Sequence, residues 1–161
     1  MNAKFEWDGD FWVRPVTLPF RDVQVQIRVN TDSPSDQPTQ RQIDVANLVV
    51  ASLADLKPAL DEHAANYCRE IDEDVDLAGE NIHIDYDSIG QHWSVNSVVI
   101  GDLESCSGDY YFLSCDCDWE PEHGMEFLLD GTDVIYCTDH TAAFLAADTD
   151  ESYRSFGQDG G

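Results

Sequence analysis

The residues most able to do chemistry gather in one short stretch, Cys115–Gly124, which reads C-D-C-D-W-E-P-E-H-G. It supplies two thiols, four carboxylates and one imidazole. Zinc prefers thiolate and imidazole ligands, so a metal site here would use Cys115, Cys117 and His123 with neighbouring carboxylates. A glutamate close to a histidine could also exchange protons in general acid–base catalysis.

Side-chain alternation in front of this stretch favours a structural role for the thiols. If Tyr110–Cys117 is a strand, one face carries Tyr111, Leu113, Cys115 and Cys117, with Trp119 continuing it. A free cysteine on a core face packs as a small hydrophobe, and no cationic side chain lies nearby to lower a thiol pKa. We therefore expect no catalytic residue, bound metal or cofactor, with a metal-binding domain or metal-dependent enzyme centred on Cys115–His123 as the alternative.

The second half of the stretch predicts a shaped connection that could be a recognition surface. Pro121 restricts its own backbone and that of Glu120, and Gly124 can supply a positive φ where the next strand begins. Tyr110 and Phe112 alternate away from the cysteine face, and if no helix covers them they would be exposed aromatic anchors ringed by charge. The predicted binding residues are Tyr110, Phe112, Asp116, Asp118, Trp119, Glu120, Glu122 and His123.

Other chemical motifs are absent or weak. The sequence has no P-loop, no G-x-G-x-x-G opening a helix, no G-x-S-x-G, no H-E-x-x-H and no C-x-x-C. His83, Asp85 and Asp87, with His92 further on, could form a weak cation site, but their alternation with apolar residues favours the solvent-facing side of a strand. The acidic run 72–79 has its glycine in the wrong place for a calcium loop.

Strand signals occur on both sides of a central helical region. Asp22–Val29 alternates strictly between apolar and polar residues, and Asp8-Gly9 and Asp130-Gly131 are hairpin signals. The predicted strands are Lys4–Trp7, Phe11–Val13, Asp22–Val29, Asn81–Asp87, Ser94–Ile100, Tyr110–Cys117, Gly124–Leu129 and Val134–Cys137.

From about Gln40 to Glu70 the apolar period becomes helical. Pro58 fits a first helical turn better than a helix interior, so we predict two helices divided near Ser52–Asp55. The fold class is therefore α+β, a mostly antiparallel sheet with a pair of helices packed on one face. We expect one domain over residues 1–147, a helical turn at Thr141–Ala147 and a flexible tail over residues 148–161.

Charge excludes several functions. There are 33 Asp and Glu residues against 8 Lys and Arg residues, so the net charge is 8 − 33 = −25. Binding to nucleic acid or to an anionic membrane surface requires clustered cations and is not expected. No apolar run approaches the ~20 residues of a membrane span. The polar start does not resemble a signal peptide, and the odd count of 5 cysteines argues against a disulfide framework. We expect a soluble, cytoplasmic protein.

The order of these features resembles an uncharacterised bacterial family of small α+β domains. The resemblance runs from Phe5 to Thr138. It depends on Trp7-Asp8-Gly9 in the first hairpin, the helical region within Ser35–Tyr67, and above all the W-[DE]-P-E-H-G phrase at Trp119–Gly124. Some relatives resemble immunity proteins of polymorphic toxin systems, which implies a protein-binding role without implying catalytic residues.

Two interpretations of the charge remain. Self-repulsion among so many carboxylates destabilises a compact fold, so either a cationic partner or a saline environment must favour them. The leading hypothesis is a non-enzymatic acidic binding protein, of immunity type, that neutralises a basic protein partner such as a toxin. The alternative is a general domain of a salt-adapted bacterium whose acidity is environmental.

Overall fold

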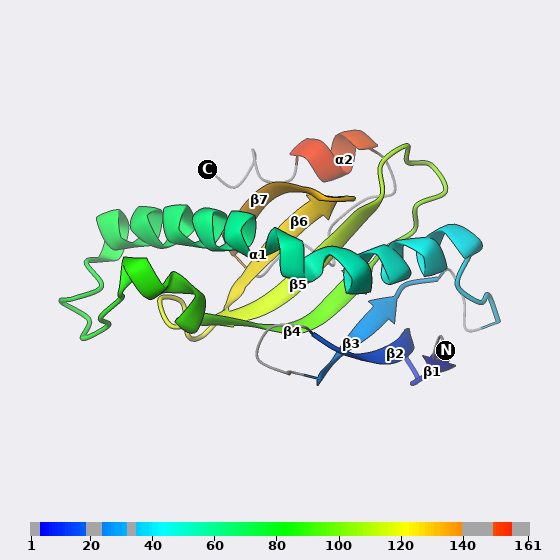
Figure 1. Ribbon diagram of the computed structural model, residues 1–161, viewed down its shortest axis with the longest axis horizontal. Helices are drawn as coiled ribbons and strands as arrows, with labels where there is room; N and C mark the ends of the chain where they lie inside the picture. Colours follow the sequence, from blue (N-terminus) through cyan, green and yellow to red (C-terminus); the bar gives the residue numbers. More distant parts are fainter. Residues whose placement is uncertain (1–3, 19–23, 32–34, 140–149, 156–161) are drawn as a thin grey trace.

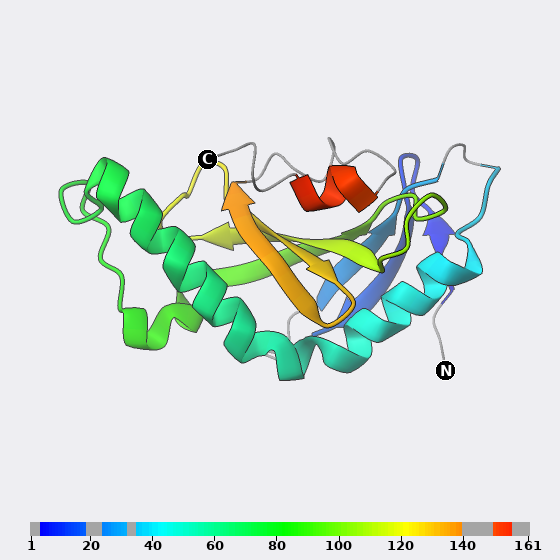
Figure 2. The same ribbon diagram turned by 90° about the horizontal axis from the view of Figure 1, so that it is seen from above.

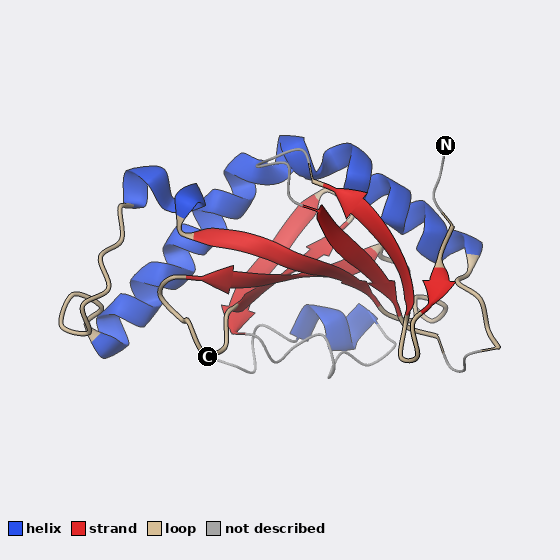
Figure 3. Cartoon of the chain, turned by 90° about the horizontal axis from the view of Figure 1, so that it is seen from below, coloured by secondary structure: helices blue, strands red, loops and turns tan. Residues whose placement is uncertain are grey.

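The computed structural model describes residues 4–18, 24–31, 35–139 and 150–155. Seven strands form one sheet in the order β1 to β7 (Figure 1). Figures 2 and 3 show this sheet lying between the long helix α1 on one face and the short helix α2 on the other. The elements are β1 Glu6–Trp7, β2 Trp12–Thr17, β3 Gln24–Val29, α1 Gln40–Val75, the 3₁₀ helix η1 Tyr86–Gln91, β4 Trp93–Ile100, β5 Tyr110–Cys117, β6 Met125–Asp130, β7 Asp133–Asp139 and α2 Asp150–Ser155.

The sheet is antiparallel except at one step. β3 and β4 run parallel, with Ile27 opposite Val98, while every other neighbouring pair is antiparallel. Parallel neighbours cannot be joined by a tight turn and need a crossover. That crossover contains α1, so the α+β class and the mostly antiparallel sheet are confirmed.

The predicted pair of helices is wrong, because α1 is a single helix of 36 residues with Pro58 inside it. A buried stripe that includes Leu53, Leu56 and Leu60 runs through the proline without interruption. Interior proline removes one backbone hydrogen bond and costs about 3 kcal/mol, and Figure 2 shows the helix bending near its middle. Continuous packing on the sheet therefore holds one bent helix where the local signal predicts two.

A buried glutamine fixes the start of α1. Thr39 and Gln42 form a capping box, each side chain bonded to the other residue's backbone N–H. The Gln42 amide also donates to the carbonyls of Asn30, at 3.0 Å, and Gly101, at 2.9 Å. Asn30 follows β3 and Gly101 follows β4, so one side chain ties the crossover helix to the ends of both parallel strands.

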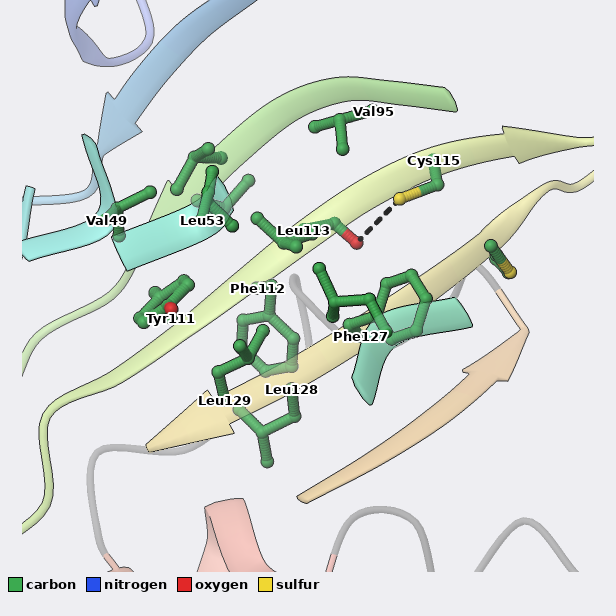
Figure 4. Packing of buried hydrophobic residues seen from close by; sticks show 14 of the residues in the cluster. Val49, Leu53, Val95, Tyr111, Phe112, Leu113, Cys115, Phe127, Leu128 and Leu129 are labelled. Atoms are coloured by element: carbon green, nitrogen blue, oxygen red, sulfur yellow. Dashed lines mark hydrogen bonds between the residues drawn. The ribbon is translucent and has the colours of Figure 1, made fainter. Parts of the chain in front are cut away.

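The central strand β5 is buried on both faces. Leu113 and Cys115 belong to the core on the α1 side, part of which is drawn in Figure 4. On the opposite face the ring of Tyr110 stacks on Tyr153 of α2, with centroids 4.5 Å apart. A strand covered on both sides is apolar throughout rather than alternating, as the buried run of Tyr110–Cys115 shows.

Most of the other predicted strands are confirmed, within a few residues at their ends. Both hairpins form, with positive φ at Gly9 and Gly131. The predicted strand Asn81–Asp87 is wrong: Asp85 caps η1 by accepting a hydrogen bond from the Asp87 N–H, which turns the chain away from an extended course. Part of the expected flexible tail forms α2, whereas the expected turn at Thr141–Ala147 lies outside the described residues. None of the helices in the described ranges combines the length and apolar character that a membrane span requires.

The central role of Gln42 gives a first prediction. Gln42→Leu removes half of the capping box and leaves two carbonyl groups without this donor, so the free energy of unfolding should fall by about 2 kcal/mol. Urea denaturation followed by circular dichroism measures the change. Gln40→Leu is the matched control, because Gln40 is exposed and its side chain bonds to Asp44 on the helix surface. An equal loss in both variants would contradict the role of Gln42.

Candidate functional site

The end of β5 and the connection from β5 to β6 form an acidic surface that we call the turn surface, made of Asp116, Asp118, Glu120, Glu122 and His123. Asp116, Asp118, Glu122 and His123 are exposed, and Glu120 is half-buried. The turn lies at the same end of the molecule as the C-terminus of α1 (Figure 2). These residues are the exposed or half-exposed part of the predicted binding set.

Two backbone features make this turn rigid. Gly124 has a φ of 69° and its N–H donates to the Glu120 carbonyl at 2.8 Å. A Cβ at Gly124 would lie 2.2 Å from the carbonyl oxygen of Cys115, so only glycine fits. Trp119, with 2% of its surface exposed, anchors the turn in the core. The shaped connection expected from the sequence is therefore confirmed for the backbone at Gly124.

Two histidine side chains, His92 and His123, pair with carboxylates of the turn surface. Glu120 Oε1 lies 2.9 Å from His123 Nδ1, and this hydrogen bond is the main cause that raises the pKa of His123. Asp118 Oδ2 lies 2.8 Å from Nδ1 of His92, whose other ring nitrogen accepts the Asp85 N–H at 3.1 Å. Within the described ranges, Asp116 and Glu122 form no ion pair. The turn surface thus keeps a net negative charge.

The other three predicted binding residues lie inside the protein. Tyr110, Phe112 and Trp119 are 0%, 1% and 2% exposed. Exposure of Tyr110 and Phe112 required a face free of helices, and Tyr153 of α2 covers that face. These aromatic side chains are therefore not available as surface anchors in this structure.

The thiols of the stretch are core residues, as their alternation predicts. Cys115 and Cys117 are buried, and burial raises the pKa of Cys117 to about 12 and that of Cys115 well above its ordinary value. Cys115 Sγ donates to the Leu113 carbonyl at 3.6 Å, while His123 is exposed on the turn. No group of three or more His, Cys, Asp or Glu side chains in the described part of the chain is arranged to hold a metal ion.

A groove lies between α1 and η1 that the sequence did not predict. It encloses about 690 Å³ and includes Lys57, Asp61, Arg69 and Tyr86 in its lining. Lys57 pairs with Asp61 and lies 4.5 Å over the ring of Trp93. Arg69 lies 4.7 Å over Tyr86. The available signal was the spacing of four residues from Lys57 to Asp61 and on through Ala65 to Arg69, which aligns them on one helix face.

A second feature that the sequence did not reveal is the loop between β4 and β5. Arg41 of α1 donates to the carbonyls of Leu103 and Gly108, each at 2.7 Å, and also to the Cys106 carbonyl. Asp150 of α2 accepts hydrogen bonds from the backbone N–H groups of the same loop. No local pattern identifies these contacts, because the partners are separated by more than 40 positions.

Comparison with known proteins gives a family without an assigned activity. A family model described as "Domain of unknown function (DUF6985)" matches residues 2–144. No curated protein and no solved structure matches the chain.

The rigid turn can be tested with two glycines. Gly124→Ala introduces both a left-handed alanine and a clash with the Cys115 carbonyl, so unfolding should become easier by about 3 kcal/mol or more. Gly131→Ala is the matched control, since Gly131 has a φ of 60° but nothing lies within 4 Å of the added Cβ. It should cost about 1 kcal/mol. Thermal denaturation measures both, and equal losses would show that the close approach to Cys115 is unimportant.

Burial of the thiols predicts their reactivity. Because the thiolate is the reactive form, Cys115 and Cys117 should resist a thiol reagent at pH 8 in the native protein and react fully in denaturant. Mass spectrometry after timed labelling identifies each modified cysteine. Rapid native labelling of either residue would place its thiol outside the core and contradict this assignment.

Proposed function

We propose that this chain, which belongs to the DUF6985 family of domains of unknown function, is a non-enzymatic binding protein that captures a cationic protein partner. An immunity-type protein that neutralises a basic toxin has this property. The observation that carries the proposal is the turn surface, which presents carboxylates without Lys or Arg partners among the described residues, on a chain of net charge −25.

Negative charge extends from the turn surface to neighbouring elements. Asp139 of β7 is opposite Met125, the first residue of β6 after the turn. Burial is the main cause that raises the pKa of Tyr67 in α1, and the charges of Asp139 and Glu120 raise it further. Acidic side chains on adjacent elements complement the charge of a basic protein surface.

The C-terminal part of α1 adds negative charge at the helix end where the helix dipole disfavours it. Its last turn has no basic residue, while Asp72, Glu73 and Asp74 are exposed there. Carboxylates near a helix C-terminus oppose the helix dipole, at a cost of a few tenths of a kcal/mol each. Acidic residues that destabilise the helix yet gather at the same end as the turn surface support a role in binding.

Binding kinetics test the proposal. The partner to try is the product of the neighbouring reading frame, and the variant is Asp116→Asn/Asp118→Asn/Glu122→Gln, which keeps the shape of each side chain. Loss of electrostatic steering should lower the association rate about tenfold at low salt and flatten its dependence on salt concentration. Surface plasmon resonance at two salt concentrations measures both quantities.

A matched control removes the same charge elsewhere. Glu6→Gln/Asp10→Asn/Asp55→Asn neutralises three exposed carboxylates that are distant in sequence from the turn, and the association rate should stay within about twofold of wild type. Equal effects of the two triple variants would remove the assignment to the turn surface. No binding at low salt, with no protection of cells from the neighbouring product, would reject the function. Equal acidity in unrelated proteins of the same organism would point to salt adaptation instead.

A further inference from the structure

The loop between β4 and β5 forms a receptor for a carboxylate on the α2 side of the sheet. Asp150 accepts hydrogen bonds from the N–H groups of Ser107, at 2.9 Å, and Gly108, at 3.1 Å. The hydroxyls of Ser107 and Tyr110 donate to the same carboxylate at 3.1 Å and 2.9 Å. These bonds, led by the two backbone ones, lower the pKa of Asp150 to about 2. Four donors directed at one carboxylate make a specific site for it.

The receptor is held in shape by residues that do not belong to α2. Arg41 binds the carbonyls of Leu103, Cys106 and Gly108. Asp130 accepts the N–H of Asp109 at 2.9 Å. Because the loop is fixed by these contacts, its donors are already in place when a carboxylate arrives, which lowers the entropic cost of binding.

An aromatic subsite lies beside the carboxylate receptor. Tyr153 is 1% exposed and its ring is nearly parallel to that of Tyr110, at 11°. Phe112 borders the same ring, with centroids 5.9 Å apart. A Cβ at Gly101 would lie 2.6 Å from the Tyr153 hydroxyl, so the missing side chain leaves room for the ring. The sheet therefore has a shaped place for one aromatic side chain.

α2 contacts these subsites as a short ligand would. It has 6 residues, fewer than the ~12 that make an isolated helix even marginally stable. The side-chain contacts described for it run through Asp150 and Tyr153, and the Tyr136 hydroxyl adds a bond to the Tyr153 carbonyl at 3.2 Å. All the receptor residues lie within the family-matched range 2–144, whereas α2 lies beyond it. The receptor thus lies inside the family-matched range and its occupant lies outside it.

We propose that this face is a docking site for a protein segment that carries a carboxylate three residues before an aromatic ring, and that α2 is its displaceable built-in occupant. The required chemistry is that of Asp150 and Tyr153: one acid for the loop donors and one ring for the Tyr110 subsite. A partner segment that offers both takes the place of α2. The proposal does not depend on the turn surface, which lies at the end of β5 and on the β5–β6 connection.

Peptide binding in trans tests the site with the full-length chain. The probe is a fluorescent synthetic peptide with the sequence of residues 149–155, T-D-E-S-Y-R-S. In the wild type α2 fills the site, so Asp150→Ala/Tyr153→Ala should bind the peptide at least about tenfold more tightly, because the fraction of open sites limits apparent affinity. Fluorescence anisotropy measures both constants. Peptides with alanine in place of the acid or the ring should lose binding.

The control variant changes α2 without touching the receptor. Glu151→Ala replaces an exposed neighbour and should bind the peptide as weakly as the wild type. If circular dichroism shows that the double variant is unfolded, Asp150→Ala alone serves in its place, because it frees the loop donors while Tyr153 still covers the Tyr110 ring. Equal binding by opened and wild-type chains, or binding that ignores the peptide's acid and ring, would overturn the proposal. A wild-type dimer that Tyr153→Ala dissociates would assign the site to a second copy and overturn it as well.

Discussion

The fold depends on the single parallel step between β3 and β4. A sheet made only of hairpins could leave one face open, but a parallel step forces the chain to leave the sheet and return. α1 forms this crossover connection, and its buried stripe covers one face of the sheet. Gln42 fastens the start of the helix to the residues after β3 and β4, so the crossover, the strand ends and the helix cap form one unit.

The strand β5 divides the molecule into two chemical environments. One face, with Leu113 and Cys115, packs toward α1, and these two side chains are buried in the hydrophobic core. The other presents Tyr110 and Phe112 to Tyr153 of α2. At its end the chain turns under the constraint of Gly124 and brings acidic side chains to the surface. The two surfaces to which we assign binding roles are therefore set by the two ends of the same buried strand.

Sequence patterns predicted the strands well where local chemistry decides. Alternation in Gln24–Val29 and the glycine of each hairpin need no distant partner to be effective, and the structure contains both features. The alternation of 81–87 was equally regular, yet the Asp85 cap and packing of Ile82 and Ile84 against the core produced a loop and η1. Pro58 likewise ends a helix by local rules, but the stripe through Leu56 and Leu60 kept α1 continuous.

The sequence by itself determined the charge, the class of fold, the core role of Cys115 and Cys117 and the rigid turn at Gly124, because each follows from composition or from neighbours along the chain. Only the tertiary structure decided that Tyr110 and Phe112 are covered, because α2 reaches them from more than 40 positions away. The same holds for Arg41 and Asp150 on the loop between β4 and β5. Contacts between distant segments depend on how the elements pack together, and the spacing of residues within one segment cannot predict that packing.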